Sequence, residues 1–293
     1  MSITSYDDID VGSLIGRGVT ATVYSGHRNG KALAVKKIAY PSLTKWKAFK
    51  RELDVLKAVQ HRNIVSFLGF CESPTLLTIF SEFCEGGCLF DLLHASNIEL
   101  LITQKCAMLG DVAVSMEYLH GLKPAVIHRD LKSLNLLLAK PIRSELDMPC
   151  VKLCDFGSAR VMELEVERGP NSESSTLTRN VGTSHWMAPE VASGAYDKKA
   201  DVYSFAMVMF ELFSLLLPFA ELDGPEVVAA AAQGVRPDLE ELDPDIPPVL
   251  ADLMVRCWAP LPKERPSFQD VCRLLSQENF YCASDLLPDS VRL

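Results

Sequence analysis

Apolar and polar residues follow two different periods along the chain. Residues 20–24 are rich in β-branched and aromatic side chains, and residues 32–35 resume the same pattern, so both stretches predict strands. Asn29-Gly30 between them is a strong signal for a two-residue hairpin turn. Residues 76–83 predict a further strand.

Three longer stretches have helical spacing instead. Apolar residues recur every three or four positions in residues 45–60 and 105–120, and residues 200–216 are apolar nearly all round, as expected for a buried central helix. Strands with one helix thus precede a mostly helical part, and "CEGG" at residues 84–87 breaks the pattern as a hinge would. The chain is therefore expected to be an α+β protein.

Composition narrows the class of protein. With 293 residues, 48% of them hydrophobic, the chain can bury a large core in one or two lobes. The net charge of −9 argues against general affinity for nucleic acid or for an anionic membrane. The first twelve residues lack the apolar segment of a secretory signal, and the longest apolar run, residues 204–220, contains Glu211 and is too short to span a bilayer.

Cysteine usage indicates the compartment. Nine cysteines are an odd number and their scatter forms no disulfide framework, so a reducing, cytoplasmic and soluble setting is expected. Cys84 and Cys88, like Cys150 and Cys154, are separated by three residues, but the further ligands of a zinc site are missing. Small buried apolar side chains are the favoured interpretation.

The stretch "IGRGVTATVYSGHRNGKALAVKK" contains Gly16, Gly18 and Ala21 in the pattern G-x-G-x-x-A, which fits a dinucleotide fingerprint, a flap over the phosphates of ATP, or a plain turn. A dinucleotide site needs a helix directly after the glycines and an acidic residue about 20 positions later. A strand follows here, and no acidic residue lies between Asp10 and Glu52. The flap is therefore favoured.

Ala34 and Lys36 are expected on one face of the strand that follows the hairpin, because side chains alternate along a strand. A small apolar side chain suits a flat base, and an ammonium suits a phosphate. Glu52, beside the apolar stripe of the first helix, is the candidate partner of Lys36. An exposed helical charge is the alternative for Glu52.

Two polar turns follow apolar, strand-like runs in the second half of the chain. "VIHRDLKSLNLLL" contains Asp130, Lys132 and Asn135, and "VKLCDFGSAR" delivers Asp155 into a turn with a glycine. Mg²⁺-dependent phosphoryl transfer requires oxygen ligands for the cation, positive charge for the transferred group and a carboxylate that orients the attacking hydroxyl. These residues supply all three.

On these motifs the sequence resembles a eukaryotic protein kinase catalytic domain. The glycine-rich loop (residues 16–23), "AVK" ending in Lys36, "HRDLKSLN", "DFG" (155–157) and "APE" (188–190) occur in the order of that family. "GTSHWMAPE" and "RCWAPLPKERPSF" resemble the tyrosine-kinase-like group, which includes Raf-type and mixed-lineage kinases. Ala21 departs from the third glycine of the flap and implies a stiffer loop.

The resemblance implies a bilobal fold, with a small, mostly antiparallel β lobe that carries one helix and a larger, mostly helical lobe. The kinase domain would span residues 6–275, with the N-lobe at about 6–81, the hinge at about 82–87 and the C-lobe at about 88–275. Residues 276–293 would form a short tail.

It also implies a role for each matching residue. Lys36 would hold the α- and β-phosphates and pair with Glu52, Asp130 would be the catalytic base, and Lys132 would neutralise the γ-phosphate. Asn135 and Asp155 would hold Mg²⁺. The residues expected around ATP are Ile15, Gly16, Arg17, Gly18, Val23, Ala34, Lys36, Glu82, Cys84 and Leu137.

Three further positions match supporting residues of the family. Asp201 is similar to the aspartate of the central helix that supports the catalytic loop, and Glu190 with Arg265 resembles the pair that ties the activation segment to the C-terminal helices. Arg129 is similar to the arginine that receives a phosphorylated activation loop.

The resemblance favours serine and threonine hydroxyls of protein substrates. A dual-specificity or tyrosine kinase and a pseudokinase scaffold remain alternatives, while a dinucleotide-dependent oxidoreductase lacks its required residues. A scaffold has no chemical need for Lys36, Asp130, Asn135 and Asp155 together, and all four are present.

Phosphorylation of the segment before "APE" is the regulation that the sequence predicts, by an upstream kinase or by autophosphorylation. The candidate acceptors are Ser172, Ser174, Ser175, Thr176 and Thr178, and a disordered loop with incidental hydroxyls is the alternative at each of these sites. A phosphate there would pair with Arg129 and order the segment, so phosphatase treatment should lower the phosphorylation rate of a peptide substrate. An unchanged rate after complete dephosphorylation would rule this out.

Overall fold

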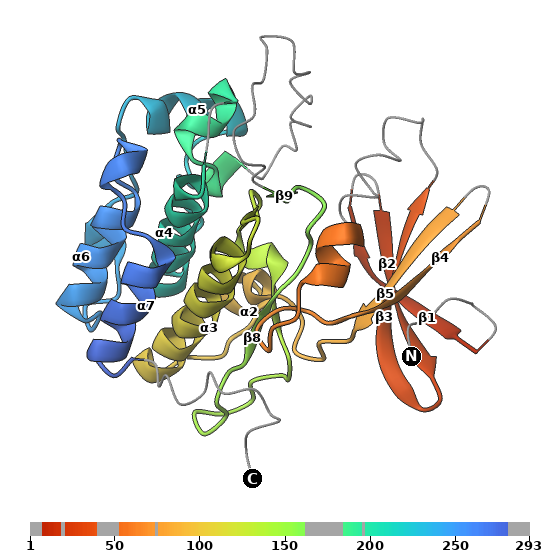
Figure 1. Cartoon of the computed structure of the whole chain (residues 1–293). Helices are drawn as coiled ribbons and strands as arrows, with labels where there is room; N and C mark the ends of the chain where they lie inside the picture. The colour runs from red at the N-terminus through yellow and green to blue at the C-terminus, as the bar shows by residue number, and fades with distance from the viewer. Residues whose placement is uncertain are drawn as a thin grey trace, which may run out of the picture.

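The computed structural model describes residues 8–18, 21–39, 53–73, 76–161, 184–194 and 197–280. A β-sheet forms one part of the molecule and a group of helices the other, as Figure 1 shows. The chain is thus an α+β protein with an antiparallel sheet in the N-terminal lobe and helices in the C-terminal lobe, as the sequence predicted.

The sheet has five antiparallel strands in the order β1-β2-β3-β5-β4. Their bounds are β1 Asp10–Arg17, β2 Ala21–Arg28, β3 Lys31–Ala39, β4 Phe67–Glu72 and β5 Leu76–Glu82. The predicted hairpin is confirmed: Asn29 (φ 50°) and Gly30 (φ 75°) join β2 to β3, and two consecutive positive φ values are what a type I′ turn requires.

Strand register explains where Lys36 lies. Leu33 and Val35 of β3 are buried in the small core on one face of the sheet. Ala34 and Lys36 therefore project from the other face, and Lys36 pairs with Ile79 of β5. Ile79 packs with Leu53, the first described residue of a helix over residues 53–58. That helix ends before Gln60, two residues earlier than the spacing indicated.

The C-terminal part is built around α4 (Lys199–Ser214). Every residue of α4 from Ala200 to Phe213 is buried, which confirms the central helix predicted from its uninterrupted apolar character. The other helices are α2 Leu89–His94, α3 Ile102–Gly121, α5 Gly224–Ala232, α6 Pro248–Cys257 and α7 Phe268–Gln277. In Figure 1, α3, α4, α6 and α7 lie on the side of the molecule away from the sheet. No helix in the described ranges is both long and apolar enough to cross a bilayer.

Two pairs of short antiparallel strands lie between these parts. β6 (Val126–Ile127) pairs with β9 (Arg160–Val161), and β7 (Leu136–Leu138) pairs with β8 (Val151–Leu153). β8 also exchanges backbone hydrogen bonds with the segment before β4: Val65 N–H donates to the Leu153 carbonyl at 2.9 Å, and Leu153 N–H donates to the Asn63 carbonyl at 2.8 Å. The turn that follows β8 therefore lies next to the sheet side of the molecule.

A buried ion pair between Glu190 and Arg265 joins the "APE" segment to the residues before α7 and to the start of α4. Arg265 donates to both carboxylate oxygens of Glu190 at 2.5 and 3.0 Å and to the backbone carbonyls of Lys199 and Ala259 at 2.9 Å each. Its guanidinium lies 5.1 Å from the ring centre of Tyr203. The predicted pairing of Glu190 with Arg265 is confirmed.

Breaking this pair should be costly because the Arg265 side chain is completely buried. Arg265→Ala should lower the free energy of unfolding by about 3–5 kcal/mol, since it removes a buried guanidinium that donates to the Glu190 carboxylate and to two backbone carbonyls. Arg273→Ala is the matched control: Arg273 pairs with Asp270 on the surface of α7, and its loss should cost less than about 1 kcal/mol. Urea unfolding of both variants measures the difference, and equal losses would contradict this assignment.

Candidate functional site

The polar loop (residues 128–135) between β6 and β7 gathers three of the predicted residues. Lys132 Nζ donates to both carboxylate oxygens of Asp130 at 2.9 Å. Asn135 Nδ2 donates to the Asp130 carbonyl at 2.7 Å and to Asp130 Oδ2 at 3.0 Å. Asp130 is thus held between a cation and an amide, with its orientation fixed by both.

Asp201, in the first turn of α4, holds the backbone of this loop. Its carboxylate accepts hydrogen bonds from the backbone N–H groups of His128 (2.9 Å) and Arg129 (2.8 Å), and it contacts His120 Nε2 at 2.8 Å. Burial alone would raise the pKa of Asp201, but hydrogen bonding and charge from His120 bring it below the ordinary value. Arg129 has a φ of 69°, a left-handed conformation that these bonds help to maintain.

Asp155 follows β8 and connects this region to the sheet. Lys36 Nζ lies 2.9 Å from Asp155 Oδ1, and the two side chains are 23% and 44% exposed. The positive charge of Lys36 is the main reason why the pKa of Asp155 falls well below its usual range, against the opposing effect of burial. The predicted partner of Lys36, Glu52, lies outside the described residues.

Asn135 and Asp155 come from neighbouring segments. The Cys154 N–H donates to the Asn135 carbonyl at 2.9 Å, continuing the ladder between β7 and β8. An amide and an ionised carboxylate are thus carried side by side, and both offer the oxygen donors that Mg²⁺ prefers. This donor set fits a magnesium ion. The part of the chain that the structure describes contains no cluster of three or more His, Cys, Asp or Glu residues that could form a metal site by themselves.

The glycine-rich segment is part of the β1–β2 hairpin. Gly16 pairs with Val23 and Arg17 with Thr22, and the Gly18 N–H donates to the Ala21 carbonyl at 2.8 Å. Ile15, on the same strand, is exposed. A strand pair, rather than the start of a helix, therefore carries the glycines, which agrees with the flap and excludes the dinucleotide geometry.

The remaining residues expected around the nucleobase of ATP lie near the point where β5 leads into the helical part. Ala34 pairs with Ser81 of β5, and Leu137 of β7 is bridged to Cys88. The Glu82 carboxylate lies 2.7 Å from Lys152 Nζ and accepts from Ser66 Oγ at 3.3 Å. Since its side chain is engaged in these contacts, any contribution of Glu82 to ligand binding would come from its backbone.

The cysteines near this junction are half-buried thiols with raised pKa values. Burial raises the pKa of Cys84 to about 12 and of Cys88 to about 11, and it raises the pKa of Cys154 further. Thiols with such pKa values are almost entirely protonated at neutral pH. The four cysteines of the two spaced pairs are half-buried rather than fully buried, and Cys88 Sγ donates to Asp91 Oδ2 at 3.1 Å, which corrects the prediction of small buried apolar side chains.

Sequence reasoning missed a second buried carboxylate on α4, Glu211. Its oxygens accept from Ser133 Oγ (2.6 Å) and Trp186 Nε1 (2.8 Å), and they contact His94 Nε2 at 2.9 Å. These four residues, the Glu211 cluster, join α4 to the polar loop, to α2 and to the segment before "APE". The available signal was a lone carboxylate within an otherwise apolar helix.

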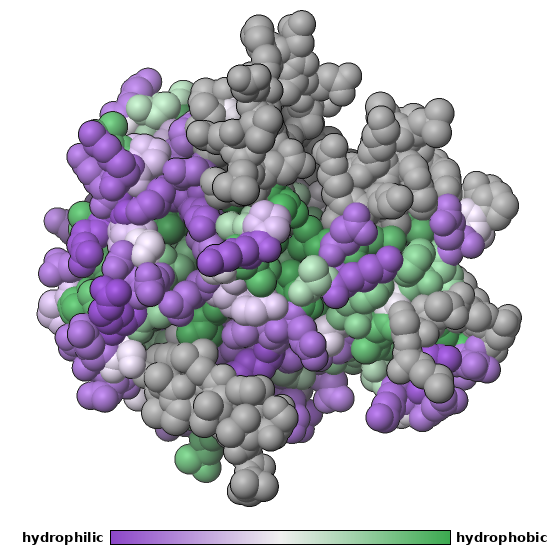
Figure 2. Space-filling view, in the orientation of Figure 1, coloured by the Kyte–Doolittle hydropathy of each residue, from purple (hydrophilic) through white to green (hydrophobic). Residues whose placement is uncertain are grey.

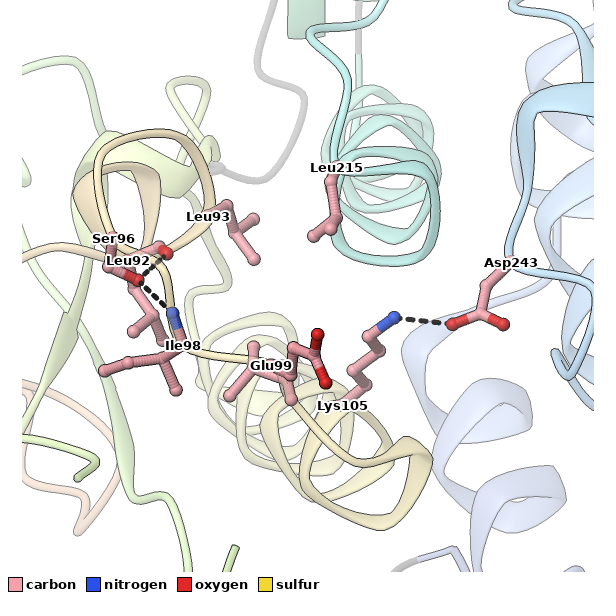
Figure 3. A pocket seen from close by; sticks show the side chains of 9 residues that line it. Leu92, Leu93, Ser96, Ile98, Glu99, Lys105, Leu215 and Asp243 are labelled. Carbon is pink, nitrogen blue, oxygen red and sulfur yellow. Dashed lines mark hydrogen bonds and ion pairs between the residues drawn. The ribbon is translucent and has the colours of Figure 1, made fainter. Parts of the chain in front are cut away.

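A cavity of about 290 Å³ lies elsewhere, between α2, the start of α3 and the end of α4 (Figure 3). Leu92, Leu93 and Leu215 line it, and an ion pair between Lys105 and Asp243 (2.8 Å) closes one side. None of the residues predicted to carry the chemistry lines this cavity. The polar groups at the junction of the two parts, rather than this cavity, form the candidate site.

Comparison with known proteins is consistent with this geometry. A family profile described as "Protein tyrosine and serine/threonine kinase" matches residues 9–275. The chain is 36% identical to the probable serine/threonine-protein kinase SIS8 of Arabidopsis thaliana over 93% of its own length and 25% of that protein. It is 34% identical to the dual specificity protein kinase pyk3 of Dictyostelium discoideum, over 91% of the chain and 18% of that protein.

Human mitogen-activated protein kinase kinase kinase 7 is also 34% identical, over 92% of the chain and 42% of that protein. The chain therefore spans less than half the length of each of these curated relatives.

The contact between Lys36 and Asp155 predicts a specific pH dependence. A lowered pKa means that Asp155 contributes stability above the ordinary carboxyl pKa of about 4, and that this contribution is lost as the pH falls through the lowered native value. Lys36→Met should raise the pKa of Asp155, because the attraction disappears while partial burial remains. The variant should therefore be less stable than the native chain at neutral pH, with a gap that narrows mainly as the pH falls below about 4, toward the lowered native pKa of Asp155.

Urea unfolding at several pH values measures this gap. Lys37→Met is the matched control on the same strand, since Lys37 Nζ lies over the ring of Tyr24, 4.9 Å from its centre. Its stability should run parallel to that of the native chain across the same pH range. A parallel curve for Lys36→Met would contradict the role of Lys36 as the source of the shift.

Proposed function

The chain belongs to the protein tyrosine and serine/threonine kinase family, and on this premise we propose that it transfers the γ-phosphate of ATP to serine and threonine hydroxyls of proteins. The observation that carries the proposal is the pairing of two carboxylates with two lysines across one junction, Asp130 with Lys132 and Asp155 with Lys36. The relatives named as serine/threonine kinases support the choice of acceptor.

In this proposal Asp130 receives the acceptor hydroxyl. Its carboxylate accepts the hydroxyl proton while the hydroxyl oxygen forms a bond to the γ-phosphorus and the bond from that phosphorus to the β-phosphate oxygen breaks. Lys132, which contacts both oxygens of Asp130, keeps a positive charge beside the transferred group. Asn135 fixes the orientation of Asp130 through its amide.

Asn135 and Asp155 are the residues proposed to hold Mg²⁺. The lowered pKa of Asp155 keeps it ionised at neutral pH, as a ligand of a divalent cation must be. Bound Mg²⁺ supplies neutralisation of the phosphate charge. Lys36 is proposed to contact the α- and β-phosphates, and Glu52 to orient it. The base would lie between the β1–β2 hairpin, Ala34 and Leu137, next to the backbone at Glu82 and Cys84.

The domain boundaries and the regulation of the chain are proposals as well. We assign residues 6–275 to the kinase domain, with the hinge at about 82–87, and residues 276–293 to a tail. Activation by phosphorylation would use the acceptors between Ser172 and Thr178, which lie outside the described residues. The eight cysteines in the described ranges are free thiols, which supports a cytoplasmic location.

Asp130→Asn should lower the turnover number by about 10²- to 10⁴-fold, because the amide cannot accept the hydroxyl proton. Nucleotide binding should stay close to that of the native chain, since Lys36 and the hairpin are unchanged. Transfer of radiolabelled phosphate to a peptide array measures the first, and calorimetric titration with ATP and Mg²⁺ the second. Asp252→Asn, at an exposed position of α6, is the control and should retain activity.

The same array distinguishes the competing functions. Analysis of the phosphorylated amino acid shows whether tyrosine also accepts phosphate. The Dictyostelium relative is named as a dual specificity kinase, which makes this a relevant alternative. A native chain that binds ATP and phosphorylates nothing, itself included, would overturn the proposed function in favour of a scaffold.

A further inference from the structure

The polar loop presents one apolar side chain to solvent. Within the 3-10 helix formed by Ser133–Asn135, Ser133 and Asn135 are buried, whereas Leu134 is 43% exposed. A 3-10 helix has about three residues per turn, so consecutive side chains point in directions about 120° apart. Leu134 therefore points away from both neighbours, on the same short turn whose next residue contacts Asp130.

A hydrogen bond to a buried carboxylate holds the inner side of this turn. Ser133 donates to Glu211, whose side chain is completely buried and whose two oxygens both have hydrogen-bond partners. The α2 helix packs directly against the turn, and there His94 is bound to Glu211 while its ring lies 4.5 Å from the ring centre of Phe90. The Glu211 cluster thus fixes the turn and its neighbours without exposing a carboxylate next to Leu134.

We propose that Leu134 is a specificity-determining residue that contacts a bulky apolar side chain of the substrate polypeptide next to the acceptor serine or threonine. The proposal rests on the proposed function, because the occupant is the segment whose hydroxyl reaches Asp130. Leu134 is close to that site along the chain: Leu134 and Asp130 are four residues apart on one hydrogen-bonded loop. Covering the exposed part of Leu134 with an apolar side chain is favourable, whereas covering it with a charge is not.

The net charge of the protein favours basic peptides rather than apolar ones, and this effect can be separated from a contact with Leu134. The net charge of −9 favours basic peptides in general, but such steering weakens as salt is added. An apolar contact at one position persists at high salt. Selectivity for an apolar residue that survives about 0.5 M NaCl, where the screening length is only a few ångströms, is therefore the signature of Leu134.

The test uses peptides that vary only at the positions flanking the acceptor, each filled in turn with Leu, Ala, Arg or Glu. The native chain should prefer Leu to Ala by about tenfold in kcat/KM at one flanking position, in low and high salt. Leu134→Ala should reduce this preference to about twofold or less. Leu134→Glu should lose it and favour Arg by up to about fivefold at low salt. Leu239→Glu is the matched control, equally exposed at 43% on another 3-10 helix, and should keep the native preference.

Each outcome decides one question. A native chain that phosphorylates the peptides without an apolar preference at any flanking position, or a preference that persists in both Leu134 variants, overturns the role of Leu134 and leaves the proposed function intact. A native chain that transfers phosphate neither to these peptides nor to a general protein substrate such as casein overturns the proposed function, and this role with it. Thermal unfolding of Leu134→Ala shows that its altered preference comes from a folded protein.

Discussion

A carboxylate that is removed from water must receive hydrogen bonds from the protein, and the central helix α4 carries two such groups. Asp201 and Glu211 lie ten positions apart in a helix whose other buried residues are almost all apolar. Each takes its donors from segments distant in sequence: Asp201 from the backbone of the polar loop and from His120, Glu211 from Ser133 and Trp186. The requirement to satisfy these two groups determines where the polar loop lies on the helical core.

The position of the loop then determines what the sheet can contribute. β7 and β8 continue from the polar loop and place Asp155 beside Asn135, and β8 is tied to the sheet side through Val65 and Asn63. Lys36 can reach Asp155 only because the register of β3 turns it to the face opposite the buried Leu33 and Val35. Strand alternation thus brings Lys36 to the junction from the sheet, and buried hydrogen bonds hold the polar loop there from the helical part. In Figure 2, the apolar residues gather mainly on the sheet and at this junction, while the helical side is largely hydrophilic.

Patterns within one element could be predicted from the sequence. The Asn29-Gly30 hairpin follows from the need for two positive φ values, and the burial of α4 follows from its apolar character. The pairing of Glu190 with Arg265 came from the family resemblance. The partners of Glu211 could not be predicted, because a buried carboxylate is visible in a sequence only as a lone acid in an apolar run. Nothing local links it to Ser133, 78 residues earlier, or to Trp186, 25 residues earlier.

The two kinds of carboxylate also differ in the partners they use, and this difference fits their roles. Asp201 and Glu211 are bound by backbone N–H groups, a hydroxyl, an indole and histidines, which hold a fixed geometry. Asp130 and Asp155 also receive a fixed donor, the Asn135 amide and the Gly157 N–H respectively, but each contacts in addition a lysine, a cation on a flexible stem. A lysine can exchange a carboxylate for a phosphate with little movement of the backbone, whereas a backbone N–H cannot follow a ligand. The lysines that a phosphate would meet can therefore move, whereas the groups that position the polar loop cannot.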